Sequence, residues 1–151
     1  MNELRITTKN AEATIELAKH IGQRLKGGEV IELLSDLGGG KTTFVRGLAD
    51  GLGSHDHVSS PTFKISNVYT AIDKELHHFD FYRLSEPGII SAELSEIIGE
   101  PDKVIVVEWG AIVEDVLPDS RLKITFTMTG EHNRQITLEC SRLLAYLTEG
   151  L

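Results

Sequence analysis

The sequence predicts an α/β protein with a central sheet of mixed strand direction, helices flanking that sheet, and antiparallel hairpins. Three observations support this fold class. The runs 29–34 and 103–109 are apolar enough to be buried on both faces, as central parallel strands are. A glycine-rich loop joins the first of these runs to a segment with helical spacing. Two later pairs of alternating segments are separated by turn residues, which is typical of hairpins.

The first half of the chain is expected to alternate strands and helices. Residues 4–8 alternate like a short edge strand, and Asn10 stands where a helix N-cap belongs. The helix that follows is predicted over 11–26 and is expected to end at the glycine pair 27–28. After the first buried run, a second helix is predicted over 42–53, because apolar residues recur there at helical spacing: Phe44, Leu48 and Leu52.

The second half is expected to supply the hairpins and the other central strand. The predicted elements are a hairpin of 63–69 and 76–84, a short helix over 89–99, the buried strand 103–109, a helical turn over 112–118, and a hairpin of 122–129 and 134–140. Gly130 and Asn133 lie in the turn of the second hairpin, where their residue types are favoured.

Length and composition indicate one domain over residues 1–151 and exclude several classes of protein. The formal net charge of -8 argues against an independent nucleic-acid binder, which usually relies on a basic face. No apolar run approaches the roughly 18 residues that a membrane-spanning helix needs, so neither a membrane nor a secreted protein is expected. The single cysteine, Cys140, cannot form an internal disulfide, which fits a reducing compartment. A cytoplasmic protein is therefore expected.

The segment SDLGGGKTTF, residues 35–44, predicts a phosphate-binding loop (P-loop). Backbone amides of a glycine-rich loop can surround a polyphosphate, while a lysine neutralises its charge and a hydroxyl binds Mg²⁺. Ser35 stands where the strict P-loop pattern has glycine, and a tight βα turn without a ligand is the alternative interpretation. The strand before and the helix after favour a P-loop NTPase-like domain that binds a nucleotide with Mg²⁺, and our hypothesis is that this nucleotide is ATP. The expected nucleotide-binding residues are Asp36, Leu37, Gly38, Gly39, Gly40, Lys41, Thr42 and Thr43.

Two carboxylates at strand ends are candidates for the metal site. Asp80 comes late in an alternating apolar run, and Glu108 ends the strand 103–109. Because ligands of open α/β sheets bind outside the carboxyl ends of the strands, both could reach the same crevice as Lys41 and join Thr42 around magnesium. The alternative for each acid is a salt bridge to Arg83 or Lys103.

Three further features have both a functional and a structural interpretation. Pro61 biases the residue before it towards an extended conformation, which could present Thr62 to the γ-phosphate, or Thr62 could simply begin a strand after a rigid turn. Either Thr62 or Glu108 could position the attacking water. Trp109 could shape the nucleotide pocket or only pack. A zinc site is disfavoured because the histidines match a loop pair and a strand pair better: His55, His57, His77 and His78.

The motifs SDLGGGKTTF, SSPTF, HHFDFYRL and VVEW, in that order, resemble the bacterial TsaE family from about residue 10 to Pro118. The resemblance implies a small ATPase of tRNA threonylcarbamoyladenosine modification. Partners are implied as well: TsaB and TsaD homologues, of which TsaD transfers the threonylcarbamoyl group, so that tRNA is reached only through the complex. For single residues, the resemblance implies phosphate and magnesium binding by Lys41 and Thr42, loop support by Thr43, a switch segment with Thr62, a magnesium-directing Asp80, and Glu108 with Trp109 beside the reacting phosphate.

The expected activity is ATP hydrolysis that is slow alone and faster in a complex, because no residue is marked as an arginine finger. Arg46 and Arg83 are more simply surface or structural residues. A small-molecule kinase is a rival, although no insertion of about 30 residues is present to build its lid. A non-catalytic nucleotide-sensing subunit is the second rival, since the same loop would suffice. A GTPase is disfavoured because no N-K-x-D segment occurs.

Overall fold

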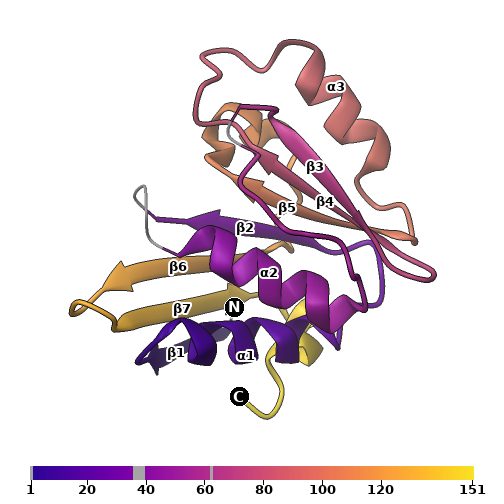
Figure 1. Cartoon of the computed structure of the whole chain (residues 1–151). Coiled ribbons are helices and arrows are strands. Elements are labelled where there is room, and N and C mark those ends of the chain that lie inside the picture. Colours follow the sequence, from indigo (N-terminus) through magenta and orange to yellow (C-terminus); the bar gives the residue numbers. More distant parts are fainter. Residues whose placement is uncertain (1, 36–39, 62) are drawn as a thin grey trace.

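In the computed structural model, which describes residues 2–35, 40–61 and 63–151, seven strands form one sheet (Figure 1). The order across the sheet is β1-β7-β6-β2-β5-β4-β3. The strands are β1 (Asn2–Thr8), β2 (Val30–Leu34), β3 (Ser66–Thr70), β4 (Glu75–Asp80), β5 (Lys103–Glu108), β6 (Leu122–Met128) and β7 (Arg134–Cys140). The helices are α1 (Ala11–Gly22), α2 (Lys41–Leu52) and α3 (Gly88–Ile97), with 3₁₀ segments η1 (Gly110–Val116) and η2 (Arg142–Thr148).

The sheet has a parallel centre and antiparallel sides. Strands β6, β2, β5 and β4 run parallel to one another, β3 pairs antiparallel with β4, and β7 pairs antiparallel with both β6 and β1. The antiparallel pairs β3–β4 and β6–β7 are the two hairpins expected from the sequence. The predicted fold class, an α/β structure with a mixed sheet, flanking helices and antiparallel hairpins, is therefore confirmed.

Helical segments cover both faces of the sheet (Figure 1). Helices α1 and α2 pack on one face, where they bury Ile21, Phe44 and Leu48. Segments α3 and η1 lie on the other face, where Leu94 and Val113 join the second apolar cluster. Along β5 successive side chains belong to alternate clusters, as expected for a strand buried on both faces. No helix in the described ranges is both long and apolar enough to cross a membrane.

Three glycines let α1 and α2 approach each other closely. A Cβ atom at Gly22 would lie 2.4 Å from the carbonyl oxygen of Leu48, and one at Gly47 would lie 2.5 Å from that of Ile15. At Gly51 the distance to the carbonyl oxygen of Lys19 would be 2.3 Å. Backbone atoms thus occupy the space that side chains would need. This contact fixes α2, whose first residues belong to the glycine loop, against the rest of the fold.

Several element boundaries differ from the sequence-based prediction. The N-cap is as expected, since the Asn10 side chain accepts a hydrogen bond from the amide of Ala13 at 2.8 Å. The helix prediction to residue 26 was wrong, because α1 ends at Gly22. The next residues form i→i−3 turns, in which Leu25 is still buried. The strand prediction from residue 63 was also wrong. Strand β3 begins at Ser66, because Ile65 has a φ of 73° and its amide closes a turn onto Pro61.

Candidate functional site

The glycine loop leads directly into the N-terminus of α2. Gly40 precedes the helix with a φ of 99°, a left-handed conformation that favours glycine, and Lys41, Thr42 and Thr43 are the first three residues of α2. The amides of a first helical turn have no partner within the helix, so they can bind an anion. Five residues with predicted roles lie outside the described residues, and their roles stay predictions: Asp36, Leu37, Gly38, Gly39 and Thr62.

The two predicted acids lie side by side at the ends of the central strands. In the sheet register, Glu108 at the end of β5 is paired with Asp80 on one side and with Leu33 on the other. Both carboxylate residues are buried, each only 4% exposed. The Asp80 carboxylate accepts a hydrogen bond from the amide of Tyr82 at 3.0 Å. The structure therefore places two buried acids at the carboxyl ends of adjacent parallel strands.

Lys41 and Glu108 form the centre of the site. The Lys41 ammonium lies 3.5 Å from Glu108 Oε1 and donates a hydrogen bond of 3.2 Å to the carbonyl oxygen of Ser35. On the other carboxylate oxygen, Glu108 Oε2 is 2.5 Å from Nε2 of His78, whose side chain is fully buried. A lysine, a carboxylate and a histidine are therefore arranged in a row, with the lysine at the end nearest the glycine loop.

The ring of Trp109 also contacts the Lys41 ammonium. The Lys41 ammonium lies 4.8 Å from the centroid of the Trp109 ring, within range of a cation–π contact. Trp109 itself has a φ of 57°, an uncommon conformation for a large residue, and its ring is 5.0 Å from that of Tyr82. Residues held in such conformations cluster at functional sites. Trp109 thus follows the predicted site residue Glu108 directly and contacts Lys41.

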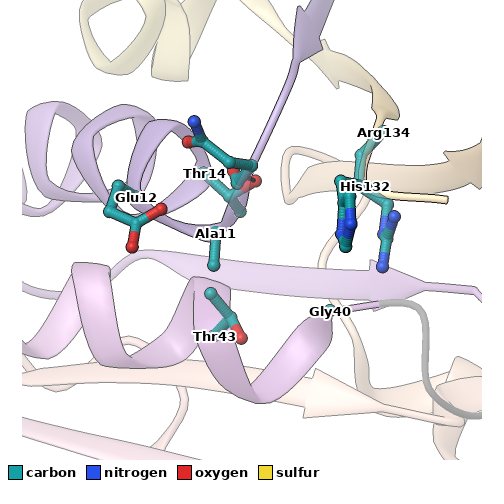
Figure 2. A pocket seen from close by; sticks show the side chains of 8 residues that line it. Ala11, Glu12, Thr14, Gly40, Thr43, His132 and Arg134 are labelled. Carbon is teal, nitrogen blue, oxygen red and sulfur yellow. Dashed lines mark hydrogen bonds between the residues drawn. The ribbon is translucent and has the colours of Figure 1, made fainter. Parts of the chain in front are cut away.

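A cavity of about 300 Å³ adjoins the start of α2 (Figure 2). Figure 2 shows His132, from the turn between β6 and β7, and Arg134, the first residue of β7, reaching towards Gly40, while Ala11 and Thr14 line the cavity from α1. A Cβ atom at Gly40 would lie 3.9 Å from Arg134 Nε. The lining residues are Asn10, Ala11, Glu12, Thr14, Gly40, Thr43, His132 and Arg134.

Comparison with known proteins decides the family. The family model described as "Threonylcarbamoyl adenosine biosynthesis protein TsaE" matches residues 8–136, which is most of the chain. The chain belongs to the TsaE family. The resemblance noted in the four motifs is thereby confirmed, and the match extends past Pro118 into β7.

Individual TsaE proteins match over most of their own length. The tRNA threonylcarbamoyladenosine biosynthesis protein TsaE of Bacillus subtilis is 38% identical over 142 residues, covering 91% of this chain and 85% of that protein. The TsaE protein of Aquifex aeolicus is 42% identical over 106 residues, covering 69% and 74%. The crystal structure of YdiB from Bacillus subtilis superimposes with a TM-score of 0.80 at 33% identity, covering 97% of this chain and 91% of that one.

The alternative salt bridges considered for Glu108 do not form in this TsaE structure. Lys103 pairs instead with Glu75, Glu100 and Asp102, and the hydrogen bond to Glu100 raises the pKa of Lys103. The Arg83 guanidinium lies 4.5 Å from the centroid of the Phe63 ring. Among the described residues, Glu108 is therefore paired within the site, with Lys41, and not with Lys103 or Arg83.

Three residues at this site were missed by sequence reasoning. His78 was assigned to a strand pair without a partner, although its position two residues before Asp80 places both on the same face of β4. His132 and Arg134 were read only as part of a hairpin, and no local pattern reveals that this hairpin reaches the glycine loop. Among the residues that the structure describes, no group of three or more His, Cys, Asp or Glu side chains could hold a metal ion.

Proposed function

We propose that this chain binds ATP with Mg²⁺ and hydrolyses it to support tRNA threonylcarbamoyladenosine modification. One observation carries the proposal. The buried Lys41, at the start of α2, contacts both the carbonyl oxygen of Ser35, where the glycine loop begins, and the carboxylate of Glu108, where β5 ends. A lysine in that position can bind the terminal phosphate of a nucleotide, while the first helical amides bind the other phosphate oxygens. The names of the matched TsaE proteins support the biological process.

The donor set around the helix start fits magnesium. Thr42 is the second residue of α2, and Asp80 and Glu108 are adjacent in the sheet register, so one hydroxyl residue and two carboxylate residues lie at the loop ends of α2, β4 and β5. Magnesium prefers such oxygen ligands and usually completes its shell with water and phosphate oxygens. When bound, the ion would neutralise charge that develops on the phosphates. In our proposal Thr42 and Asp80 hold it directly or through water, and Glu108 lies beside it.

The cavity beside Gly40 is proposed to receive the nucleoside. Its volume of about 300 Å³ lies at the small end of the range for ligand pockets. His132 and Arg134 offer planar groups that can stack on a base, and Asn10 offers hydrogen-bonding groups that can read one. Since Gly40 borders both the cavity and the helix start, one ATP molecule can place its base in the cavity and its phosphates at Lys41.

The attacking water is proposed to be positioned by Glu108, with Thr62 as the alternative from the switch segment. Glu108 can accept a proton from water because its Oε1 faces the lysine side of the site. Most of the acceleration would come from Lys41 and the bound ion, because phosphoryl transfer depends mainly on positioning and charge.

Partner proteins are proposed to complete the reaction. Arg83 stacks on Phe63, and Arg46 lines a separate cavity with His55 and Asp56, so neither is given a role at the phosphates. We therefore expect slow hydrolysis alone and faster hydrolysis with TsaB and TsaD homologues in the cytoplasm. The net charge of -8 supports an indirect contact with tRNA, through those partners.

The test measures ATP affinity and phosphate release with and without the TsaB and TsaD homologues. Lys41→Ala should weaken ATP binding about 100-fold, because a hydrogen bond to a charged group contributes about 1.5–3 kcal/mol. Lys26→Ala is the matched control, since its ammonium also lies over an aromatic ring, 4.2 Å from the centroid of Tyr146, but away from the site. Full ATP affinity in Lys41→Ala would remove the phosphate assignment.

Two further measurements test nucleoside binding separately from phosphate binding, and hydrolysis separately from the two rival functions. Arg134→Ala should weaken ATP binding but leave the affinity for inorganic triphosphate unchanged, because in our proposal Arg134 stacks on the base. Phosphate release from ATP and water without any acceptor would exclude the kinase. Tight ATP binding with no release, even in the complete complex, would favour the nucleotide-sensing subunit.

A further inference from the structure

His78 is a buried histidine on the strand that carries Asp80. It is paired with Val106 in the register of β4 and β5, and its exposed fraction is 0%. Its neighbours on the same face of the two strands, Leu76 and Val104, are also fully buried. Placing an imidazole among aliphatic side chains costs free energy unless it is hydrogen-bonded. The packing of the core alone therefore gives no reason for a histidine here.

The hydrogen bonding of this histidine is directed at one carboxylate oxygen. Nε2 donates to Glu108 Oε2, whereas Nδ1 has no hydrogen-bond partner among the described residues. The opposite oxygen, Oε1, faces the Lys41 ammonium at 3.5 Å. The two oxygens of Glu108 thus have different partners: one belongs to the interior of the sheet and the other to the reactive side of the site.

The adjacent histidine shows what an ordinary strand histidine does in this protein. His77 points to the other face of β4, is partly exposed, and contacts Glu75 at 3.1 Å. That pair lies near the start of the strand, away from Lys41 and Glu108. Two consecutive histidines therefore have separate environments, and His77 provides a matched control for His78.

We propose that His78 is a positioning residue that holds Glu108 in the orientation needed for hydrolysis. The inference rests on the proposed function. The terminal torsion of a glutamate is broad, so a carboxylate without the His78 donor can rotate and pair with Lys41 through either oxygen. The histidine bond fixes Oε2 and keeps Oε1 directed at the phosphate side. Outer partners that orient a ligand or base in this way typically change activity about 10- to 100-fold when removed.

The experiment compares four variants in the complete complex with the TsaB and TsaD homologues: His78→Asn, His78→Gln, His78→Phe and His77→Asn. A glutamine amide nitrogen reaches about as far as imidazole Nε2, whereas the asparagine amide is one bond shorter and phenylalanine has no donor. His78→Asn should lower kcat about 10- to 100-fold with KM for ATP changed less than about threefold, and His78→Gln should recover most of the loss. His77→Asn should match the wild type.

Each result supports or overturns the assignment. If His78→Asn does not fold, as judged by circular dichroism, His78→Phe keeps the ring volume and should show the same fall in kcat. Wild-type kcat in either folded variant, or an equal loss in His78→Gln, would overturn it. In a Glu108→Gln background, where the carboxylate is gone, removing the histidine donor should cause no further loss in single-turnover hydrolysis. Wild-type protein that hydrolyses no ATP would refute the proposed function itself.

Discussion

Two buried clusters of a cation and a carboxylate lie on opposite faces of neighbouring strands. On the η1 face, Arg121 Nε donates to Glu32 Oε1 at 2.9 Å, its Nη2 donates to both oxygens of Glu114 at 2.7 and 2.8 Å, and its Nη1 donates to the carbonyl of Pro118. On the α2 face, Lys41 lies 3.5 Å from Glu108. Both glutamates, Glu32 and Glu108, are 4% exposed.

The difference between the clusters lies in how completely their groups are paired. Each nitrogen of the Arg121 guanidinium has an acceptor, and although burial lowers the pKa of Arg121, the hydrogen bonds to Glu32 and Glu114 raise it more. In the part of the chain that the structure describes, the buried side-chain nitrogens without a partner are His78 Nδ1 and Trp109 Nε1, and both belong to residues that contact the Lys41–Glu108 pair. A saturated cluster stabilises the fold, whereas an incompletely paired one is suited to a ligand.

The largest expected effect on stability comes from breaking the saturated cluster. Arg121→Met should lower the free energy of unfolding by about 3–5 kcal/mol, because it leaves the Glu32 carboxylate buried without its cation. Urea denaturation measures the change. Arg5→Met is the matched control, since Arg5 Nε also lies 2.9 Å from a glutamate, Glu3, but at the surface, where about 0.5 kcal/mol is expected. Equal changes in the two variants would contradict the comparison.

The same kind of change in the open cluster should affect activity instead. Glu108→Gln keeps the side-chain shape and an oxygen that can accept from His78, so it should lower the free energy of unfolding less than Arg121→Met does, while kcat falls about 100-fold or more, as for loss of a general base. ATP affinity should stay near that of the wild type. Denaturation, ATP binding and phosphate release together measure the contrast. Hydrolysis at the wild-type rate would transfer the water-positioning role away from Glu108.

The smallest effect is expected at the outer arm of the saturated cluster. The Glu114 side chain is 55% exposed, so water can replace much of its contact with Arg121. Glu114→Gln should lower the free energy of unfolding by less than about 1 kcal/mol, as partly exposed ion pairs usually do. Glu32→Gln, at the buried arm, provides the comparison by the same denaturation assay. A loss at Glu114 as large as that at Arg121 would show that the cluster acts as one unit.

Much of the fold could be predicted because local signals agreed with the final structure. The buried strands β2 and β5, the Asn10 cap and the helix ended by Gly53 all follow from patterns within a few residues. Predicted element boundaries were wrong where contacts distant in the sequence determine the end of an element. The amide of Ile65 bonds to Pro61 and its carbonyl accepts from Asp80, so the chain turns there instead of continuing β3.

The sequence predicted only those site residues that stand at the ends of helices and strands. Lys41, Asp80 and Glu108 come together because each stands at the loop end of its element, which the sequence reveals. The contact between His78 and Glu108 depends on β4 lying beside β5 in the register that pairs Asp80 with Glu108. The approach of Arg134 to Gly40 depends on β6 lying beside β2, and strand order is not written in any local pattern.

The pairing of β1 with β7 constrains how the chain can fold as it is made. Strand β1 is hydrogen-bonded to β7 alone in the sheet order, so residues 2–8 cannot take their place until residues 134–140 have left the ribosome. Until then β7 has not formed, and β1 has no strand in the sheet with which to pair. The chain must therefore be synthesised past residue 140 before β1 can join the sheet, which makes this pairing a late, non-local folding step.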